Sequence, residues 1–360
     1  MKWMFFAPIY AALLFGPASD AQEMESARFP SLAAALKIPA PLTFCGEPVP
    51  LEVQEVRERL DKELLLTLWD RPQVILWLKR SPRYLSIIEK MLKEAGLPDD
   101  IKYVALAESA LRPHAGSHKG AIGFWQFRNG TGRMHGLRID RSVDERRNIY
   151  PSTEAAIRYF RELKKAFGTW TLAIAAFNMG ENGLQTEILE QGTNDYYRLY
   201  LSLETQRYVF RILSVKLVLS DPARYGFHLS PEDLYPPLEF DRVTFDLSRE
   251  TPIRAVAKAA KTHFKMIKDL NPEVRGYVLS SGSHTLSVPK GAGLGFQERL
   301  RGILSKAALD REEQVYVVTE GDNLSSIAEQ FDIPLPAIIL WNRLDPDKPI
   351  HPGDRVIIQR

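Results

Sequence analysis

The sequence predicts a multidomain protein that is mainly α-helical over its first two thirds and ends in a small α+β module. From about residue 51 to 225, apolar side chains recur at helical spacing. From about residue 313 onward, two strand-like runs flank two short helical runs, which gives the order strand, helix, helix, strand. The length of 360 residues is enough for two or three domains with cores of their own.

Charge and motif content exclude several classes of function. The formal net charge is only +2 and there is no block of Lys and Arg, so we expect no nucleic-acid partner. The seven His residues show no paired metal-ligand spacing. No G-x-S-x-G motif of a serine hydrolase occurs either. We therefore expect no metal and no cofactor.

The first 21 residues have the pattern of a secretory signal peptide. A short charged start leads into an apolar run from Met4 to Phe15, and small residues precede a cleavage site after Ala21. The run is short for a membrane span, although an uncleaved anchor is the alternative. Cys45, the single cysteine, lies too far from this run to be a lipidation site. We expect an exported protein, periplasmic or associated with the cell envelope, that is not a lipoprotein and has Cys45 as a semi-buried structural thiol.

The helical part is expected to follow an extended, loosely packed lead-in over residues 22–50, which are rich in Pro and Ala. The run from Trp170 to Phe177 is apolar on every side, so it predicts a central buried helix that ends at Gly180. Apolar periodicity and stop signals predict further helices at 51–66, 71–95, 151–167 and 205–219.

The remainder divides into a middle segment and a tail. In the middle, strand-like runs at 243–247 and 285–288 flank a helical run at 253–269, and a charged helix follows at 294–311. In the tail, strands at 315–318 and 355–358 flank helices at 324–331 and 336–342.

Glu108 is the first candidate for chemistry. Ile101, Val104, Ala105 and Glu108 have the offsets i, i+3, i+4 and i+7, so this carboxylate lies on an apolar stripe. Partial desolvation there would raise its pKa toward that of a general acid. The alternative is a buried structural Glu, paired with Arg or backbone donors.

Five motifs follow one another in a fixed order: Glu108-Ser109, Gly116–Gly120, Gly123–Phe127, Ala175–Gly180 and Glu204–Val209. Through them, residues 95–215 resemble the lysozyme-like catalytic domain of soluble lytic transglycosylases and goose lysozyme. The whole chain resembles the membrane-bound D type of these enzymes. The tail resembles a LysM module through Tyr316-x-Val318, Gly321-Asp322-x-Leu324, Trp341-Asn342 and Pro352-Gly353-Asp354.

This resemblance implies an organisation of the chain. It places the catalytic domain at 51–225 and the LysM domain at 313–360. Residues 226–312 are then a linker that contains a degenerate LysM-like unit or a spacer. The implied partner is the glycan strand of peptidoglycan.

The resemblance also implies site residues. Glu108 would be the single acid and base that cleaves between N-acetylmuramic acid and N-acetylglucosamine, leaving a 1,6-anhydro end. Most glycosidases need two carboxylates, but here the C6 hydroxyl of the sugar is the nucleophile. The implied substrate-binding residues are Ser109, Ser117, Trp125, Gln126, Phe177, Asn178, Glu204 and Tyr208. The implied glycan-binding residues of the LysM module are Gly321, Asp322, Leu324, Pro352 and Gly353.

Several of these residues have structural alternatives. Ser109 could bond back to its own helix, Trp125 could fill the core, and Asn178 could cap the buried helix. Glu204 could form a surface ion pair with Arg207, and the tyrosines at 196, 197 and 200 could serve packing alone.

Phe177 stands where the family usually has Tyr, so we expect Glu108 to lose a hydroxyl donor and its pKa to be higher. Two other functions stay open. They are a hydrolytic muramidase on the same fold and a non-catalytic cell-wall binding protein.

Overall fold

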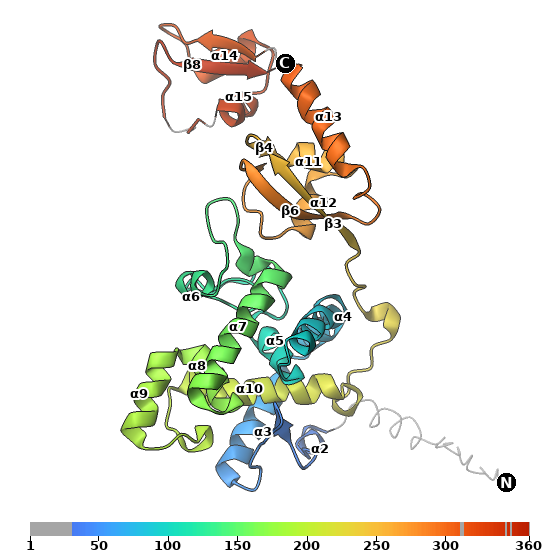
Figure 1. Ribbon diagram of the computed structural model, residues 1–360, viewed down its shortest axis with the longest axis vertical. Coiled ribbons are helices and arrows are strands. Elements are labelled where there is room, and N and C mark those ends of the chain that lie inside the picture. Colours follow the sequence, from blue (N-terminus) through green and yellow to red (C-terminus); the bar gives the residue numbers. More distant parts are fainter. Residues whose placement is uncertain (1–30, 310–312, 343, 346–347, 360) are drawn as a thin grey trace, which may run out of the picture. The chain divides into compact units, whose positions relative to one another are not determined.

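The computed structural model describes residues 31–309, 313–342, 344–345 and 348–359. The predicted signal peptide lies outside the described residues. The chain folds into two compact units (Figure 1). Among the described residues, unit 1 contains those up to Glu239 together with Asn271–Gly276, and unit 2 contains Phe240–Leu270 and those from Tyr277 onward. Over the described ranges, no helix has both the length and the apolar character needed to cross a membrane.

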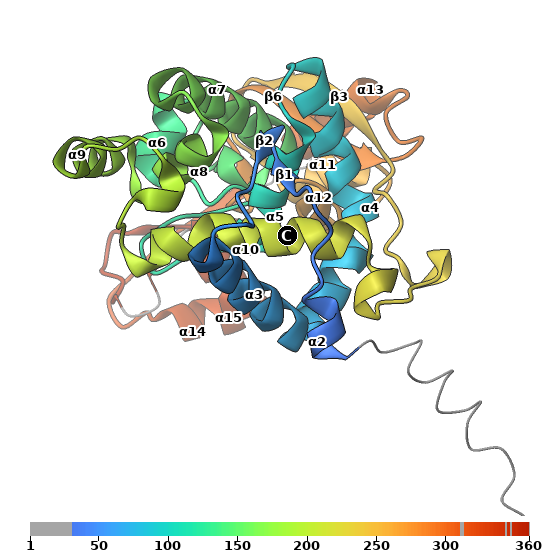
Figure 2. The same ribbon diagram turned by 90° about the horizontal axis from the view of Figure 1, so that it is seen from below.

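Unit 1 is helical, as predicted, apart from one short hairpin near its start (Figure 2). In the hairpin, β1 (Thr43–Phe44) pairs antiparallel with β2 (Glu47–Pro48). The helices are α2 (Leu32–Ala35), α3 (Gln54–Trp69), α4 (Arg71–Glu94), α5 (Lys102–Ser109), α6 (Asn129–Met134), α7 (Ile149–Phe167), α8 (Trp170–Met179), α9 (Glu181–Gln191) and α10 (Leu203–Ser220). Single 3-10 turns lie at Asp99–Ile101, Glu145–Arg147, Tyr196–Arg198, Ala223–Tyr225 and Pro231–Asp233.

Helix α10 is the central helix of unit 1, because it packs against α3, α5 and α8. Ser202 begins it by accepting a hydrogen bond from the Thr205 backbone N–H. Its neighbour α8 is buried from Thr171 to Ala176, as its apolar sequence predicted. Gly180 ends α8 with a φ of +92°, a conformation that favours glycine. These packed helices hold the start of α10 and the end of α8 in fixed positions.

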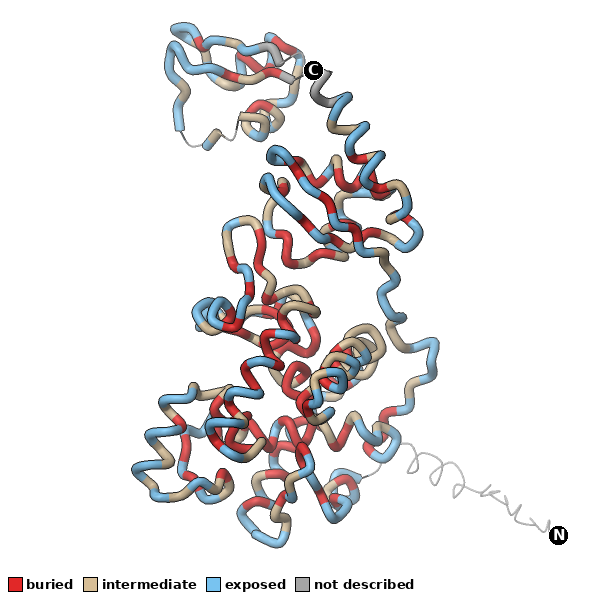
Figure 3. The backbone as a smooth tube through the Cα atoms, viewed as in Figure 1, coloured by how far each residue is buried: buried red, intermediate tan, exposed pale blue. Residues whose placement is uncertain are grey.

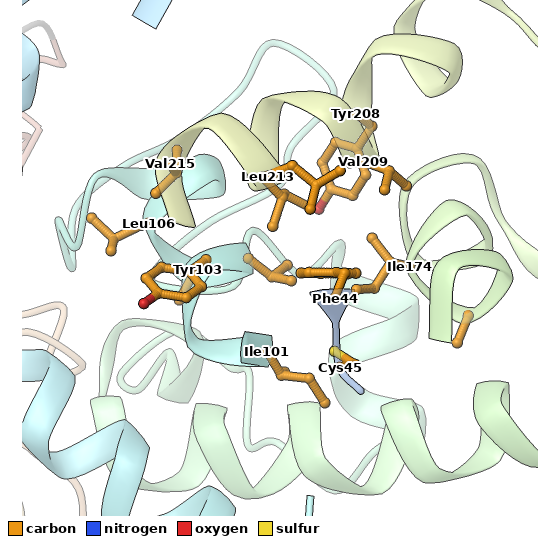
Figure 4. Packing of buried hydrophobic residues seen from close by; sticks show 14 of the residues in the cluster. Phe44, Cys45, Ile101, Tyr103, Leu106, Ile174, Tyr208, Val209, Leu213 and Val215 are labelled. Atoms are coloured by element: carbon orange, nitrogen blue, oxygen red, sulfur yellow. The ribbon is translucent and has the colours of Figure 1, made fainter. Parts of the chain in front are cut away.

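The described part of the lead-in is not loosely packed, in contrast to the prediction. The side chain of Phe44 is fully buried, in the same cluster as Ile101 and Ile174 (Figure 4). The backbone N–H of Cys45 donates to Asp100 Oδ2 at 2.7 Å. Cys45 is itself buried, and burial raises the pKa of its thiol. A composition rich in Pro and Ala predicted the lack of long helices here, but it carries no information about burial.

The middle segment of unit 2 is a folded βααβ arrangement. Strand β3 (Phe240–Leu247) pairs antiparallel with β6 (Gly282–Pro289), from Phe240↔Pro289 to Leu247↔Gly282. Buried and exposed residues alternate along both strands (Figure 3). Between them lie β4 (Thr251–Pro252), α11 (Ile253–Ala259), α12 (Phe264–Leu270) and β5 (Val278–Leu279). The single helix expected over 253–269 is two helices, because Lys261 adopts a φ of +52°. The charged helix that follows is α13 (Phe296–Leu309).

The tail has the predicted order of strand, helix, helix and strand. Strand β7 (Glu313–Val317) pairs antiparallel with β8 (Arg355–Gln359), and α14 (Leu324–Gln330) and α15 (Leu335–Asn342) lie between them in sequence. Its core is made of Val318, Ile327, Ala328, Phe331, Ile338, Val356 and Ile358. Asn342 pins β8, since its Oδ1 accepts from Ile357 N at 2.6 Å and its Nδ2 donates to Ile357 O at 2.9 Å.

Candidate active site

Glu108 lies on the last turn of α5 and lines a cavity of about 760 Å³. The helix ends directly after it because Ala110 and Leu111 take left-handed φ values of +53° and +56°. The apolar residues of the predicted stripe, Ile101, Val104 and Ala105, are fully buried behind it. The carboxylate is thus held at the boundary between the core and the cavity.

Tyr208 is the direct partner of this carboxylate, since its hydroxyl donates a hydrogen bond to Glu108 Oε1. The ring of Tyr208 is buried in the core of unit 1 (Figure 4). Burial raises the pKa of Glu108, while the Tyr208 hydrogen bond and the charge of Arg211 lower it in part, and Glu204 raises it further. The predicted pKa direction is confirmed. Phe177 has no hydroxyl to offer, and Tyr208 supplies a donor to the carboxylate from α10. Tyr208 contacts the carboxylate instead of lining the cavity, which corrects its expected substrate contact.

One wall of the cavity is the loop from Ala115 to Arg128, which contains Ser117 and Gln126. Backbone hydrogen bonds from Ser117 N to Ala121 O and from Gly123 N to Ala115 O fold the loop onto itself. Gln126 braces it, because its Nε2 donates to Gly123 O at 2.8 Å and to Ala115 O at 3.1 Å. Gly123 has no substitute here, since a Cβ would lie 1.7 Å from the Arg146 carbonyl oxygen. The predicted pair Ser117 and Gln126 therefore does line the cavity.

A buried ion pair supports this loop from behind. Arg146 donates from Nε to Asp144 Oδ1 and from Nη2 to Asp144 Oδ2, both at 2.8 Å. Its Nη1 donates to the carbonyls of Gly120 and Phe127, both at 3.1 Å. Both charged side chains are buried, so the pair fixes two points of the loop at once. Sequence reasoning missed it, because Arg146 stands among other charged residues that look like a solvated turn.

The segment Asn271–Gly276 completes unit 1 at the same place. The Asp144 backbone N–H donates to Glu273 O at 2.9 Å, and Val143 forms a β-bridge with Val274. Asn148 Nδ2 donates to Glu273 Oε1 at 2.9 Å. The helical unit is therefore not continuous in sequence, which the predicted boundary near residue 225 did not foresee.

Another part of the cavity wall comes from the end of α8. The ring of Phe177 stacks on Phe160, with centroids 4.8 Å apart and planes 15° apart, and it meets Phe127 edge to face at 5.8 Å. Asn178 Oδ1 accepts from Thr205 Oγ1 at 2.9 Å, which joins α8 to α10. Gly180, and not Asn178, ends the helix, so the capping alternative for Asn178 is wrong.

The rim of the cavity is polar and exposed. Glu204 Oε2 lies 3.5 Å from Lys119 Nζ, and their side chains are 68% and 77% exposed. The expected alternative, an ion pair of Glu204 with Arg207, is wrong, since Arg207 Nε donates to Glu63 Oε1 at 2.6 Å. Glu204 therefore faces the cavity with a flexible lysine as its neighbour.

Two residues predicted to bind substrate are instead structural. Ser109 is buried, with its Oγ 2.9 Å from Ala105 O and 2.8 Å from Phe124 O, so it bonds back to its helix and to the loop. Trp125 is fully buried, and its Nε1 donates to Thr153 Oγ1 at 3.0 Å.

The tyrosines near the cavity differ in burial: Tyr196 is buried and packs in the core, whereas the side chain of Tyr200 is 80% exposed. The cavity residues that sequence reasoning did not select are His118, Lys119, Ala121, Phe127, Arg128, Thr131, Tyr159, Met179, Gly180, Ser202 and Thr205.

The five residues selected in the tail shape its turns and core. Gly321 and Gly353 have φ values of +93° and +96°, which favour glycine. Asp322 Oδ2 accepts from Tyr316 Oη at 2.8 Å and from Thr319 N at 2.7 Å, and these bonds lower its pKa. Leu324 packs against the module core and Pro352 is exposed. Elsewhere, within the residues that the structure describes, no cluster of His, Cys, Asp and Glu could hold a metal ion.

Comparison with known proteins matches two parts of this chain to families. Residues 86–199 match the Transglycosylase SLT domain, and residues 316–359 match the LysM domain. The chain is homologous to the membrane-bound lytic murein transglycosylase D of Escherichia coli strain K12, with 31% identity over 293 residues. The alignment covers 78% of this chain and 64% of that relative's length.

Two solved structures are also similar to this chain. One is the 70 kDa soluble lytic transglycosylase of Escherichia coli, at 18% identity and a TM-score of 0.35, covering 50% of this chain and 32% of that one. The other is an inactive variant of the lytic transglycosylase Slt of Pseudomonas aeruginosa, at 20% identity and a TM-score of 0.30, covering 42% and 26%.

Proposed function

We propose that this chain, which carries a transglycosylase SLT domain and a LysM domain, is a peptidoglycan lytic transglycosylase with Glu108 as its single acid and base. The observation that carries the proposal is the position of Glu108. It is half-buried at a cavity of about 760 Å³, its pKa is raised by burial, and a tyrosine fixes its orientation. A raised pKa favours the protonated form of the carboxyl group, which is the form that a general acid requires.

The proposed reaction uses Glu108 twice. The protonated acid gives its proton to the glycosidic oxygen between N-acetylmuramic acid and N-acetylglucosamine, and the bond from C1 to that oxygen breaks. The carboxylate then takes the proton of the muramic C6 hydroxyl, whose oxygen bonds to C1. The products are a 1,6-anhydro end and a free C4 hydroxyl, and Glu108 ends protonated again.

The other cavity residues have supporting roles in this proposal. Ser117, Gln126, Asn178 and Glu204 offer polar groups to the sugars, and Phe177 gives an apolar face. Residues 1–21 direct export to the periplasm or cell envelope. The LysM domain holds glycan near Gly321, Asp322, Leu324, Pro352 and Gly353, which raises the local concentration of cleavable bonds.

A hydrolytic muramidase is the second candidate, and one observation favours it. Glu204 is a second carboxylate on the same cavity, and hydrolysis by glycosidases uses two carboxylates. Mass analysis of the soluble fragments from purified peptidoglycan separates the candidates. We expect anhydro ends, which are 18 Da lighter than reducing ends because water is not added. Reducing ends would support the muramidase, and intact sacculi would support a non-catalytic binding protein.

A further inference from the structure

The order strand, helix, helix, strand occurs twice in the chain, and each occurrence is called a βααβ unit. In the middle segment, the antiparallel strands β3 and β6 enclose α11 and α12 in sequence, and in the tail β7 and β8 enclose α14 and α15 in the same order. The family model for LysM covers only the second of these, residues 316–359.

From the first strand to the end of the second helix, the two βααβ units also share their core positions at a constant separation of 71 residues; in the last strand the separation is 70, since buried Leu286 and Val288 correspond to Val356 and Ile358. Ile253, Val256 and Ala257 on α11 correspond to Leu324, Ile327 and Ala328 on α14. Further pairs at this separation are Phe245/Tyr316, Leu247/Val318, Ala260/Phe331, Ile267/Ile338 and Asn271/Asn342. Nearly all the apolar members are buried. A register that holds without a gap across two helices and their loops indicates an internal repeat.

The backbone repeats as well. Lys261 and Asp332, which are 71 residues apart, are both non-glycine residues with a φ of +52°. After each helix, a hydrogen bond from Thr262 N to Ala257 O is matched by one from Ile333 N to Ala328 O, at 2.9 and 3.0 Å. The same strained corner thus joins the two helices in both units.

The two βααβ units differ in net charge. Over matched windows of the sequence, residues 240–289 contain eight Lys and Arg against five Asp and Glu, a net charge of +3. Residues 311–360 contain five against nine, a net charge of −4. The sign of the charge is reversed at matching positions, since exposed Lys258 and Lys261 correspond to Glu329 and Asp332, 71 residues further along the chain. Within the described part of the chain, Arg254, Lys258 and Lys261 form no ion pair. The middle unit therefore presents a free basic stripe along α11 and the corner that follows it.

An exposed aromatic pair belongs to the same unit. The ring of Tyr277 is 73% exposed and stacks on Phe264, with centroids 5.5 Å apart and planes 20° apart. The carbonyl of Tyr277 accepts from Ile253 N at 2.9 Å, which attaches it to the start of α11, one residue before Arg254. The stacking on Phe264 holds the exposed ring of Tyr277 in one orientation, and such a flat aromatic face is suited to pack against the apolar face of a sugar ring.

We propose that Phe240–Pro289 is a second, LysM-like module that binds peptidoglycan through both its carboxylates and its sugars. The basic stripe recognises the carboxylates of the stem peptides, and the Tyr277–Phe264 pair receives a sugar face. This proposal rests on the proposed function, because it takes peptidoglycan as the polymer on which the chain acts. Peptidoglycan fits the pair of features, since it carries carboxylates beside sugars, whereas chitin has the sugars alone.

The test uses the full chain in a Glu108→Gln background, so that binding is measured without cleavage. The probes are purified sacculi, chitin, and vesicles of anionic phospholipid. The variant Lys258→Glu/Lys261→Glu makes these two positions acidic, as the matching positions Glu329 and Asp332 are in the tail. Its matched control is Lys62→Glu/Lys165→Glu, which makes the same change of charge at exposed positions of unit 1 that do not line the cavity.

We expect the variant to bind sacculi about five- to tenfold more weakly than its parent at low ionic strength, while the control changes less than about twofold. The difference should fade as salt is raised, and binding to chitin should not change. Lys258→Gln/Lys261→Gln should give an intermediate loss, and Tyr277→Ser should weaken binding to sacculi at any salt concentration.

Unchanged binding to sacculi, an equal loss in the control, or an equal loss on chitin would overturn the proposal. A loss on vesicles with none on sacculi would overturn it in favour of a membrane surface. The proposed function fails by a different measurement, the absence of anhydro ends from digests by the parent enzyme. The two failures are therefore distinguishable.

Discussion

Two carboxylates line the cavity and have opposite surroundings: Glu108 lies at its floor, next to the core, and Glu204 lies at its exposed rim. Glu108 on the floor is half-buried, accepts a hydrogen bond from Tyr208 and has a raised pKa. Glu204 on the rim is 68% exposed and faces only the flexible Lys119. The charge of an exposed group is strongly screened by water, whereas the charge of a half-buried group is screened less. The difference teaches that burial, and not the mere presence of a carboxylate on the cavity, separates the proposed proton-transfer group from a side chain suited only to weak, screened contacts.

Removal of the floor carboxylate should have the largest effect. We expect Glu108→Gln to reduce release of soluble muropeptides from sacculi by roughly 10²–10⁴-fold, the usual contribution of a general acid or base. The amide has the same shape but cannot donate and recover a proton. The thermal melting curve of the variant serves as the control for folding. Cleavage at the parent rate by a folded variant would remove Glu108 from the mechanism.

Loss of the Arg146–Asp144 ion pair behind the 115–128 loop should have the second-largest effect. Arg146→Gln removes the two-armed partner of buried Asp144, which keeps only the longer ion pair with Arg147 Nε at 3.9 Å, and frees the carbonyls of Gly120 and Phe127. We expect a loss of about 3–5 kcal/mol in the free energy of unfolding, measured by denaturant titration. Arg146→Lys should rescue little, because an ammonium group cannot make the two-armed contact. A loss below 1 kcal/mol would mean that the loop keeps its shape without the pair.

The hydroxyl of Tyr208 should tune the floor carboxylate. Its hydrogen bond lowers the pKa of Glu108 in part, so Tyr208→Phe should raise that pKa further. Because the acid form starts the reaction, the alkaline limb of the pH–rate profile should move to higher pH. We also expect kcat at the optimum to fall about tenfold, since the carboxylate loses its fixed orientation. A profile that moves to lower pH would contradict this assignment.

The sequence predicted the position of Glu108 better than the positions of the residues around it, and the reason is physical. Glu108 could be found because a carboxylate on an apolar stripe is a local pattern within one helix. Tyr208 lies 100 residues further along the chain, and its contact depends on how α10 packs against α5. Ser109 and Trp125 were placed in the site because they adjoin motif residues, but neighbours on a helix or loop can face the core.

The boundaries of unit 1 could not be predicted from the sequence either. Asn271–Gly276 is separated from the rest of unit 1 by Phe240–Leu270, and its pairing with Val143 and Asp144 is a long-range contact that no periodicity reports. Within the tail the prediction was accurate, because both strands and both helices are short and their turns carry glycines. The order of helices and strands can therefore be predicted from the sequence where it depends on local patterns, such as short elements separated by glycine turns.

The rim carboxylate gives the smallest effect and the sharpest test of the comparison. An exposed ion pair such as Lys119–Glu204 contributes at most about 1 kcal/mol, so Glu204→Gln should raise KM for soluble glycan by no more than about fivefold and leave kcat unchanged. Lys119→Gln is the matched variant, and its effect should be similar and should fade in high salt. If instead Glu204→Gln lowered kcat as far as Glu108→Gln does, the rim would hold a second catalytic group. The cavity would then have the two carboxylates of a hydrolase, and reducing ends should replace anhydro ends among its products.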